Sequence, residues 1–465
     1  MSEDSKTPEE NVFVSYVIQS GWMPPAGSSG HRKFIEKLKK KKPKELDSVI
    51  KALKYFIEGD NTVNWMINEA FRQNGIILNS PETLNNEYQT GITIPEISDL
   101  KTLLELFNQI MDEIPQFADG DLVGLPFSAV TVGIDPTLEG AAVLRLPEFN
   151  NFMKMILDKW NDFLASPDSV SDGKFVDAGW LTPKAKSSYD FPIWQQDTPG
   201  VSPYWTSWNS FFTRQFKDKN KSRPIADPNS NQVVVSASDS SLFRWDKLIS
   251  KDNTYWFKDM PYSLAEILSS SDKDQQNTIE QYDLVKMFDK GYIFQTYLNP
   301  YNFHRWWSPV NGKLLFDPIV IPGYYFAKLI LPDYGGATTE SLPYLAQVNA
   351  RGLAVIETED YGNVAFIPLG MSEVSTVSFD PNLKKGSQVK KGDEMGMFNY
   401  GGSSFALIFQ DLPDKKLEFK FKPATAVDGI AEIPYPMNPQ GASSSAGSGN
   451  YPANIGSQIG VWVDK

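Results

Sequence analysis

Two glycines followed by two serines form the stretch of this sequence with the clearest capacity for chemistry. Gly401 to Ser404 lies between a charged segment, residues 390–398, and an apolar segment, Phe405–Phe409. Glycine allows backbone conformations that other residues avoid, and a serine that follows directly can bring its hydroxyl to the preceding carbonyl. This geometry suits a chain that attacks its own Gly402–Ser403 peptide bond. On turn chemistry alone, a hairpin turn is the simpler interpretation.

Only two histidines, His31 and His304, are available for imidazole chemistry, and cysteine is absent. The lack of cysteine excludes disulfides, thiolate metal sites and cysteine nucleophiles. Two histidines are too few for a His-rich metal site, so no metal site is expected. His31 lies in a Gly/Ser/Pro-rich stretch. His304 is therefore the candidate general acid or base, although a lone histidine is more often structural.

Two long motifs resemble those of the phosphatidylserine decarboxylase family. His304-Arg305 with residues 308–313 resembles the family's His-Arg…Pro-x-x-Gly stretch. Residues 391–398 followed by Gly402-Ser403-Ser404 resemble its processing motif, Lys-Gly-x-Glu-x-Gly-x-Phe…Gly-Ser-Thr/Ser. The resemblance covers residues ~205 to 465, and its strength lies in the order of the matches. Three weaker matches support it: Ser210-Phe211-Phe212-Thr213-Arg214 with Arg223-Pro224-Ile225, Phe257-Lys258 with Tyr262-Ser263-Leu264, and Ser236-Ala237-Ser238-Asp239.

The resemblance implies self-processing at Gly402–Ser403. Ser403 would attack the carbonyl of Gly402, and elimination and hydrolysis would leave a pyruvoyl group derived from Ser403. The products would be a large chain, residues 1–402, and a small chain, residues 403–465. The pyruvoyl cofactor would form a Schiff base with the substrate amine and accept electrons as CO₂ leaves. His304 would be the acid that returns the proton.

Trp307 departs from the family's pattern. The family usually has a second histidine there, which pairs with an aspartate, here Asp239, to activate the serine. An indole can only donate a hydrogen bond, so Asp239 lacks its imidazole partner. Either Asp239 with His304 or a water activates Ser403 more slowly, or the chain stays uncleaved as a non-catalytic relative. A missing general base typically costs ~10²–10⁴-fold in rate, but processing happens once per molecule, so a processed enzyme is favoured.

The substrate is expected to be a free, aromatic L-amino acid such as tryptophan. The helical region before the core, with residues 370–376 and 396–407, resembles the soluble fungal branch of the family that includes tryptophan decarboxylases. Phosphatidylserine itself is the alternative substrate. Trp306, Trp307 and Tyr400 are candidate walls of an aromatic pocket, although core packing is the simpler interpretation for most of them. Glu373 is a further candidate for substrate binding: it is expected in an apolar strand, where its partner is Arg305 or another base, or else a polar group of the substrate.

Charge and hydropathy limit the other partners. The net charge of −13 argues against a nucleic-acid partner, because phosphate backbones demand a basic surface. No apolar run approaches the ~18 residues of a membrane span, and residues 1–11 lack a signal-peptide pattern. A cytoplasmic protein with a small-molecule substrate is therefore expected, with a homo-oligomer left open. The basic run Lys39–Lys42 with Lys44 is expected to be a solvated helix end rather than a membrane patch.

The pattern of helices and strands expected along the rest of the sequence predicts an α+β fold. A helical N-terminal domain, residues 45–165, is expected from apolar residues at helical spacing, after a poorly ordered segment, residues 1–44. A connecting region, residues 166–232, leads to a mostly antiparallel, β-rich decarboxylase core, residues 233–465. A helical insert is expected at Ser263–Leu268. The candidate strands are Val233–Val235, Tyr292–Leu298, Lys313–Ile321, Leu353–Thr358, Asn363–Leu369, Val374–Phe379, Phe405–Phe409, Leu417–Phe421 and Ile459–Val463.

Overall fold

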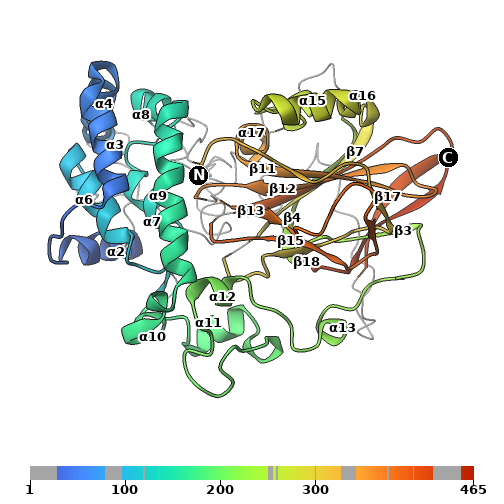
Figure 1. Cartoon of the computed structure of the whole chain (residues 1–465), viewed down its shortest axis with the longest axis horizontal. Helices are drawn as coiled ribbons and strands as arrows, with labels where there is room; N and C mark the ends of the chain where they lie inside the picture. Colours follow the sequence, from blue (N-terminus) through green and yellow to red (C-terminus); the bar gives the residue numbers. More distant parts are fainter. Residues whose placement is uncertain are drawn as a thin grey trace, which may run out of the picture.

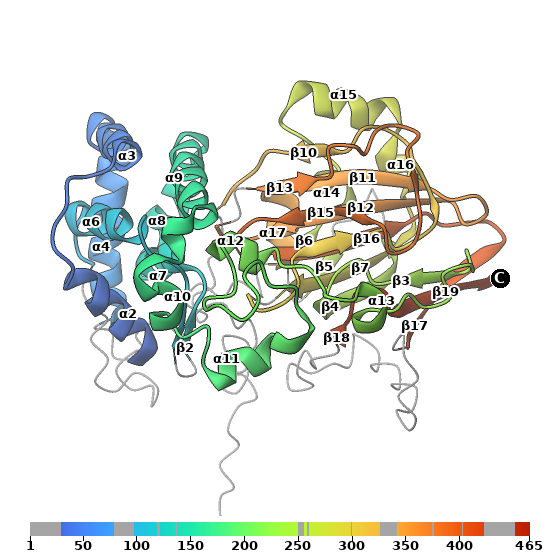
Figure 2. The ribbon, with the colours of Figure 1, turned by 60° about the horizontal axis from the view of Figure 1, so that its bottom comes forward.

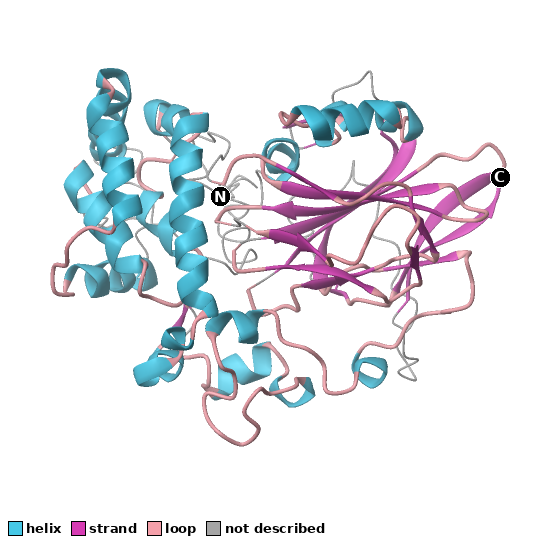
Figure 3. Cartoon of the chain, viewed as in Figure 1, coloured by secondary structure: helices cyan, strands magenta, loops and turns pink. Residues whose placement is uncertain are grey.

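The computed structural model confirms an α+β fold, with the N-terminal helices at one end of the molecule and the strands of the core, together with a few further helices, at the other (Figure 1, Figure 3). In Figure 1 the long helix α9, Pro147–Ala165, stands between the other N-terminal helices and the strands. The turned view of Figure 2 keeps the same separation. The structure describes residues 29–78, 97–118, 121–135, 137–249, 255–257, 260–298, 300–325, 342–373, 376–401, 403–422 and 452–465.

The N-terminal helices begin and bury their faces as the sequence predicts. Asp47 caps α3 by accepting from the Val49 N–H, and Asp99 caps α6 by accepting from the Thr102 N–H, which satisfies amides that the first helical turn leaves unpaired. Residues 29–39, expected in a poorly ordered segment, instead form α2 and bury Phe34, Ile35 and Leu38. The elements are α2 Ser29–Lys39, α3 Ser48–Gly59, α4 Asn61–Leu78, α6 Leu100–Ile110, the hairpin β1 Gln116–Ala118 and β2 Asp121–Val123, α7 Pro126–Thr131 and α8 Leu138–Val143.

Short helices cross the connecting region and join the two ends of the molecule. Ser207 caps α12 and forms a reciprocal capping box with Ser210. Trp205, Trp208 and Phe211 are fully buried against the N-terminal helices, in one apolar cluster that also contains Tyr400. The helices are α10 Lys174–Asp177, α11 Pro183–Ser188, α12 Trp208–Phe212 and α13 Lys219–Ser222, with 3-10 turns at Pro167–Ser169, Ser171–Gly173 and Phe191–Ile193.

A nine-stranded antiparallel sheet forms the centre of the core. Its order is β14-β9-β11-β12-β16-β7-β4-β18, with β10 also paired to β11. Two three-stranded sheets accompany it, β13-β15-β8 and β17-β19-β3, together with the hairpin β5-β6. The strands are β3 Val233–Val235, β4 Ser240–Ile249, β5 Tyr255–Phe257, β6 Met260–Tyr262, β7 Gly291–Leu298, β8 Arg305–Trp307, β9 Gly312–Leu314, β10 Ile319–Ile321, β11 Arg351–Glu357, β12 Asn363–Gly370, β13 Val377–Phe379, β14 Gln388–Val389, β15 Glu394–Phe398, β16 Ser403–Phe409, β17 Lys415–Lys422, β18 Pro452–Ala453 and β19 Gln458–Asp464.

Both faces of the central sheet are buried. Alternate residues of a strand point to opposite faces. In β16, Phe405, Leu407 and Phe409 join the cluster shared with the two small sheets. Ala406 and Ile408 join the cluster under the helices that cover the other face, which in Figure 1 lie above the strands. These helices are α14 Leu264–Ile267, α15 Lys273–Gln281 and α16 Leu284–Met287; α17 Leu342–Val348 lies near the same sheet.

The structure corrects two of the expected segments. The expected strand Lys313–Ile321 is two strands, β9 and β10, because Pro318 between them lacks the N–H that a continuous ladder needs. The charged segment before the glycines is not only a turn, since Glu394–Phe398 forms β15. Residues 374 and 375 of the expected strand Val374–Phe379 lie outside the described residues, and β13 begins at Val377.

Candidate active site

Ser403 opens β16 at the middle of the central sheet. Its Cα pairs with Gly370 of β12 on one side and Leu298 of β7 on the other. Ser403 is fully buried, and its Oγ has no hydrogen-bond partner within the described residues. Because a buried hydroxyl normally has a partner, the unpaired Oγ marks Ser403 as a candidate site residue. Gly402, the other half of the expected cleavage site, lies outside the described residues.

The hydroxyl of the neighbouring Ser404 is hydrogen-bonded to the adjacent strand β7. Its Oγ donates to the carbonyl of Thr296 at 2.6 Å and accepts from Gln295 Nε2 at 3.3 Å. Ser404 therefore contributes to strand pairing. Of the two serines, the environment of Ser403 suits a nucleophile.

His304 lies close to the turn that carries Ser403. It is fully buried, and its ring stacks on Phe212 of α12 with centroids 3.8 Å apart. Phe212 in turn contacts the ring of Tyr400 edge-on at 5.1 Å. The backbone carbonyl of His304 accepts from the Phe398 N–H at 3.0 Å. Through Phe212, the imidazole is therefore connected by ring contacts to Tyr400, which lies three positions before Ser403 in the chain.

The environment of His304 keeps its imidazole neutral. Burial, and secondly the charge of Arg214, hold the pKa of His304 well below its usual 6.5. Nδ1 lies 3.0 Å from the carbonyl oxygen of Asn302. Because a carbonyl can only accept, Nδ1 carries the proton, and Nε2 presents a lone pair. In this state His304 is a proton acceptor rather than an acid.

Glu373 and Tyr400 tie the core to the N-terminal helices. The Ser128 N–H in α7 donates to Glu373 Oε1 at 2.5 Å, and the Tyr400 hydroxyl donates to the Gly124 carbonyl. Burial, and then the charge of Glu373, raise the pKa of Tyr400 well above 10, so its phenol stays protonated. The segment 124–128 therefore covers the turns on either side of Ser403.

The expected surroundings of Glu373 were wrong in two respects. Glu373 does not lie in a strand: it follows β12 and has a φ of +64°, a left-handed conformation that is uncommon for a residue with a side chain. The partner seen in the structure is the Ser128 N–H, not Arg305. Arg305 binds Glu394 and the carbonyl of Thr213 instead. The strained backbone and buried carboxylate mark Glu373 as a candidate site residue.

Asp239 is engaged by groups other than an imidazole. Arg223 donates to both of its oxygens, with Nε at 2.9 and 3.0 Å and Nη2 at 2.7 Å. The Ile455 N–H donates to Oδ1 at 2.8 Å. Asp239 is 4% exposed. These contacts make the carboxylate an anchor between Arg223 and the C-terminal segment.

Trp306 and Trp307 point to opposite sides of β8. Trp306 packs among Phe366, Phe379 and Phe398 in the sheet core. Trp307 packs against Phe216 and Phe303, and the Lys219 ammonium lies 4.0 Å from its ring centroid. The two indoles therefore do not wall a single pocket. Both indoles are buried and pack against other side chains of the core.

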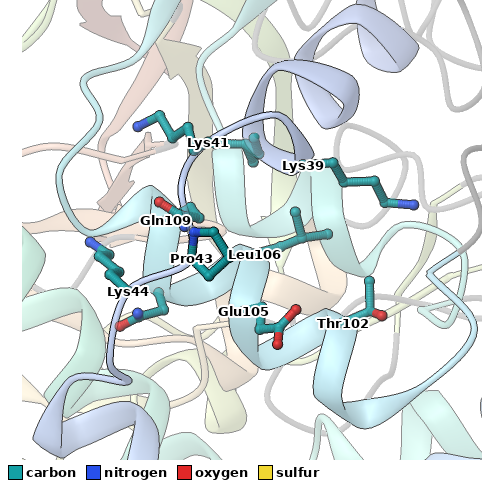
Figure 4. Close-up of a pocket in the computed structure, with 10 residues that line it drawn as sticks. Lys39, Lys41, Pro43, Lys44, Thr102, Glu105, Leu106 and Gln109 are labelled. Atoms are coloured by element: carbon teal, nitrogen blue, oxygen red, sulfur yellow. The ribbon is translucent and has the colours of Figure 1, made fainter.

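The basic run of the N-terminal region lies far along the chain from these residues and lines a surface pocket of about 120 Å³ (Figure 4). Lys41 pairs with Glu113 and Lys44 with Asp112. The pocket also contains Glu105. These carboxylates offset the lysines, as expected for a solvated helix end. Within the described ranges, no three acidic or histidine side chains gather where they could hold a metal ion.

Comparisons with known proteins give the chain its family. The family model described as phosphatidylserine decarboxylase matches residues 208–429, and a second model with that description matches residues 47–189. "Decarboxylase iboD" of Amanita muscaria is 33% identical over 310 residues, which cover 62% of this chain and 84% of the relative.

The chain belongs to the phosphatidylserine decarboxylase family.

Other relatives of this family member fall into two groups. An "L-tryptophan decarboxylase" of Psilocybe cyanescens is 28% identical over 427 residues, 77% of this chain and 93% of the relative. A "Phosphatidylserine decarboxylase proenzyme 3" of Schizosaccharomyces pombe is 29% identical over 207 residues, 44% of this chain and 19% of the relative. The family and its named decarboxylases identify this protein as a carboxy-lyase. In the described part of the chain, every helix is too short or too polar to span a lipid bilayer.

Four contacts of this decarboxylase could not be predicted from the sequence. Ser128 and Gly124 reach the site through backbone atoms, which every residue type carries. Phe212 stands in a family-like motif, but the motif does not state that it stacks on His304. The pairing of Arg223 with Asp239 was likewise hidden, although both residues lie in motifs of the family.

Proposed function

We propose that this decarboxylase processes itself at Gly402–Ser403 and then decarboxylates a free, aromatic amino acid. The observation that carries the proposal is the buried Ser403 hydroxyl, which has no partner within the described residues while Ser404 is hydrogen-bonded. A fully buried serine directly after two glycines in the sequence has the chemistry for attack on the preceding carbonyl. The Gly401 φ of +130° is a conformation that favours glycine.

His304 is the group that we assign to accept the serine proton. Its Nδ1–H is directed at the Asn302 carbonyl, so Nε2 is the basic atom. Its lowered pKa keeps the neutral form at physiological pH. Once it holds a proton, the same imidazole is a strong acid, because burial and Arg214 both disfavour the cation. That change suits an acid that returns a proton to the product carbon.

The surroundings of Ser403 fit a pyruvoyl group. The position is fully buried and belongs to a strand that is paired on both sides, and a pyruvoyl group is small and uncharged, as such a position requires. A pyruvoyl group supplies a carbonyl that withdraws electrons as CO₂ leaves. Tyr400 offers a protonated phenol nearby, and Glu373 places a carboxylate beside it. Segment 124–128 limits the access of water to both.

Two observations support a free amino acid as substrate. The relatives named L-tryptophan decarboxylases match over 93% and 76% of their own length, whereas the relatives named phosphatidylserine decarboxylase proenzymes match over 19% to 60% of theirs. In this chain the N-terminal helices also cover the turns beside Ser403. A covered site suits a small molecule better than a lipid in a bilayer.

An assay of CO₂ release tests which substrate the protein decarboxylates. Purified protein would be incubated with tryptophan, tyrosine, phenylalanine and vesicles that contain phosphatidylserine. We expect turnover of at least one aromatic amino acid. Turnover of phosphatidylserine alone would refute the amino-acid assignment and leave the family's eponymous reaction as the activity.

A second candidate function is that of an uncleaved, non-catalytic relative. Trp307 stands where the family's histidine is expected, and Asp239 is bound by Arg223 and Ile455. Intact-mass measurement separates the two candidates. A single species at 52.2 kDa supports the non-catalytic relative. Two chains divided between residues 402 and 403, with a pyruvoyl cap on the smaller one, support the enzyme.

A further inference from the structure

A pocket separate from Ser403 opens in the connecting region, close to His304. Its volume is about 190 Å³, enough for roughly six water molecules or a small organic acid. We refer to it as the Arg214 pocket. Its floor is formed by the buried side chains Trp205, Thr213 and Arg214, and its rim by the exposed side chains Gln195, Asp197 and Gln215.

Arg214 is a buried cation with an incomplete set of acceptors. Its side chain is 2% exposed, and Nη2 donates to the Tyr301 carbonyl at 2.5 Å and to the Asn302 carbonyl at 3.2 Å. Nε has no acceptor within the described residues. The guanidinium lies 4.2 Å from the ring centroid of Trp194. Burial lowers the pKa of Arg214 to about 9, and a nearby anion would offset this cost.

Among the other polar groups of the Arg214 pocket are Arg305, the indole N–H of Trp205 and the carboxylate of Asp197. Arg305 also lines the pocket, where its charge is paired with Glu394. The indole N–H of Trp205 has no acceptor among the described residues. Asp197 places a carboxylate on the rim, where it accepts from the Thr206 N–H and hydroxyl. The buried cation Arg214 at the floor and the carboxylate of Asp197 at the rim match the carboxylate and the ammonium of an amino acid.

We propose that the Arg214 pocket is a second binding site for a free amino acid, and that its occupancy is transmitted to His304. The carboxylate would lie beside Arg214, and the ammonium would face Asp197. The binding stands on the pocket alone. Only its effect on turnover rests on the function proposed above.

One carbonyl connects the pocket to His304. The Asn302 oxygen accepts from Arg214 Nη2 at 3.2 Å and from His304 Nδ1 at 3.0 Å. Arg214 is the charged group whose field acts on His304, and it lowers the pKa of the imidazole. The nearby Asp239 and Arg223 form an ion pair and offset each other. A carboxylate beside Arg214 would therefore weaken its field and favour protonation of His304.

The presence of only two histidines makes the test direct. With ¹⁵N-labelled histidine, the imidazole signals of His31 and His304 would be followed by NMR at fixed pH during titration with glycine, acetate and sodium chloride. His31 is an internal control, because it lies in α2 and bonds the Ala129 carbonyl. We expect glycine and acetate to shift the His304 signal to saturation, with no shift for His31 and none for chloride at equal ionic strength.

Rim variants assign the shift to the pocket. Gln215→Glu adds a negative charge at the exposed rim, which repels an anion without an ammonium group, and should weaken acetate binding about tenfold, equivalent to ~1.4 kcal/mol. Gln196→Glu adds the same charge at a neighbouring residue that does not line the pocket and should leave binding unchanged. Asp197→Asn should remove the advantage of glycine over acetate.

Three results would overturn the proposal. The first is an unchanged His304 signal at saturating glycine. The second is equal shifts of both histidines. The third is a Gln215→Glu protein that binds acetate as the parent does. Each can be read without turnover, so failure here is distinguishable from failure of the proposed decarboxylation, which the CO₂ assay reports.

Discussion

Replacement of Asp239 by asparagine separates an anchoring role from a catalytic one. Among the described residues, this carboxylate accepts hydrogen bonds from Arg223 and from the Ile455 N–H. Asp239→Asn removes the charge and sets an amide N–H₂ against the Arg223 donors. We therefore expect a loss of stability without a loss of self-processing, since Trp307 offers no imidazole to connect Asp239 with Ser403.

The size of the loss follows from the burial of the pair. Breaking a fully buried ion pair costs ~3–5 kcal/mol. Arg223 is 20% exposed in its side chain and Asp239 is 5% exposed, so the lower end, about 3 kcal/mol, is expected. At roughly 2 °C per kcal/mol for a large domain, the melting temperature should fall by about 6 °C.

The assay follows cleavage and folding in the same sample. Freshly synthesised chains would be sampled over time by intact mass and checked by circular dichroism, well below the melting temperature. Asp162→Asn, on the exposed face of α9, is the matched control, and His304→Asn should block cleavage. A folded Asp239→Asn protein that stays a single chain, while Asp162→Asn is cleaved, would refute the anchoring role and place Asp239 in the chemistry.

Three further predictions follow from the same contacts. Ser403→Ala should remain one chain by intact mass, whereas Ser404→Ala should still be cleaved but lose about 1–2 kcal/mol in denaturant unfolding, because its bonds to Thr296 and Gln295 are lost; cleavage of Ser403→Ala would exclude this nucleophile. Glu373→Gln should lower the free energy of unfolding by about 1–2 kcal/mol, since the Ser128 N–H then meets a neutral acceptor; an unchanged value would mean that this contact does not join the two ends of the molecule. Burial lowers the pKa of both His31 and His304 below 6.5, so below pH 6.5 the unfolded chain binds more protons than the native one. Stability should therefore fall as the pH drops through this range, by up to ~1.4 kcal/mol per pH unit for each histidine, and His31→Asn should reduce the slope.

Alternating patterns and motif order predicted much of the core. The apolar runs around residues 292–298, 363–369 and 405–409 became β7, β12 and β16, which lie side by side. Helical spacing around Leu103 and Met153 likewise predicted α6 and α9. Such apolar patterns can be read from the sequence because they lie within one helix or strand and depend only on which of its faces is buried.

The contacts that complete the candidate site were not predictable in this way. Glu373 meets a backbone N–H 245 positions away, and a main-chain donor has no residue type by which it could be found. The polar sequence of β4, from Ser240, hides a strand that is stabilised by its pairing to β7. Trp306 and Trp307 were considered together as pocket walls, whereas adjacent strand residues point to opposite faces.

The position of β16 sets the order in which this protein can be made. β16 lies between β12 and β7, with seven paired positions on each side. Both neighbours precede residue 402 in the chain, and β19 near the C-terminus pairs with β3 in the same way. A separately produced 403–465 fragment would have to enter the middle of a sheet whose two flanking strands had already met. Synthesis as one polypeptide avoids this competition: assembly comes first, any cut at residue 402 comes second, and the two pieces remain interleaved after the bond is gone.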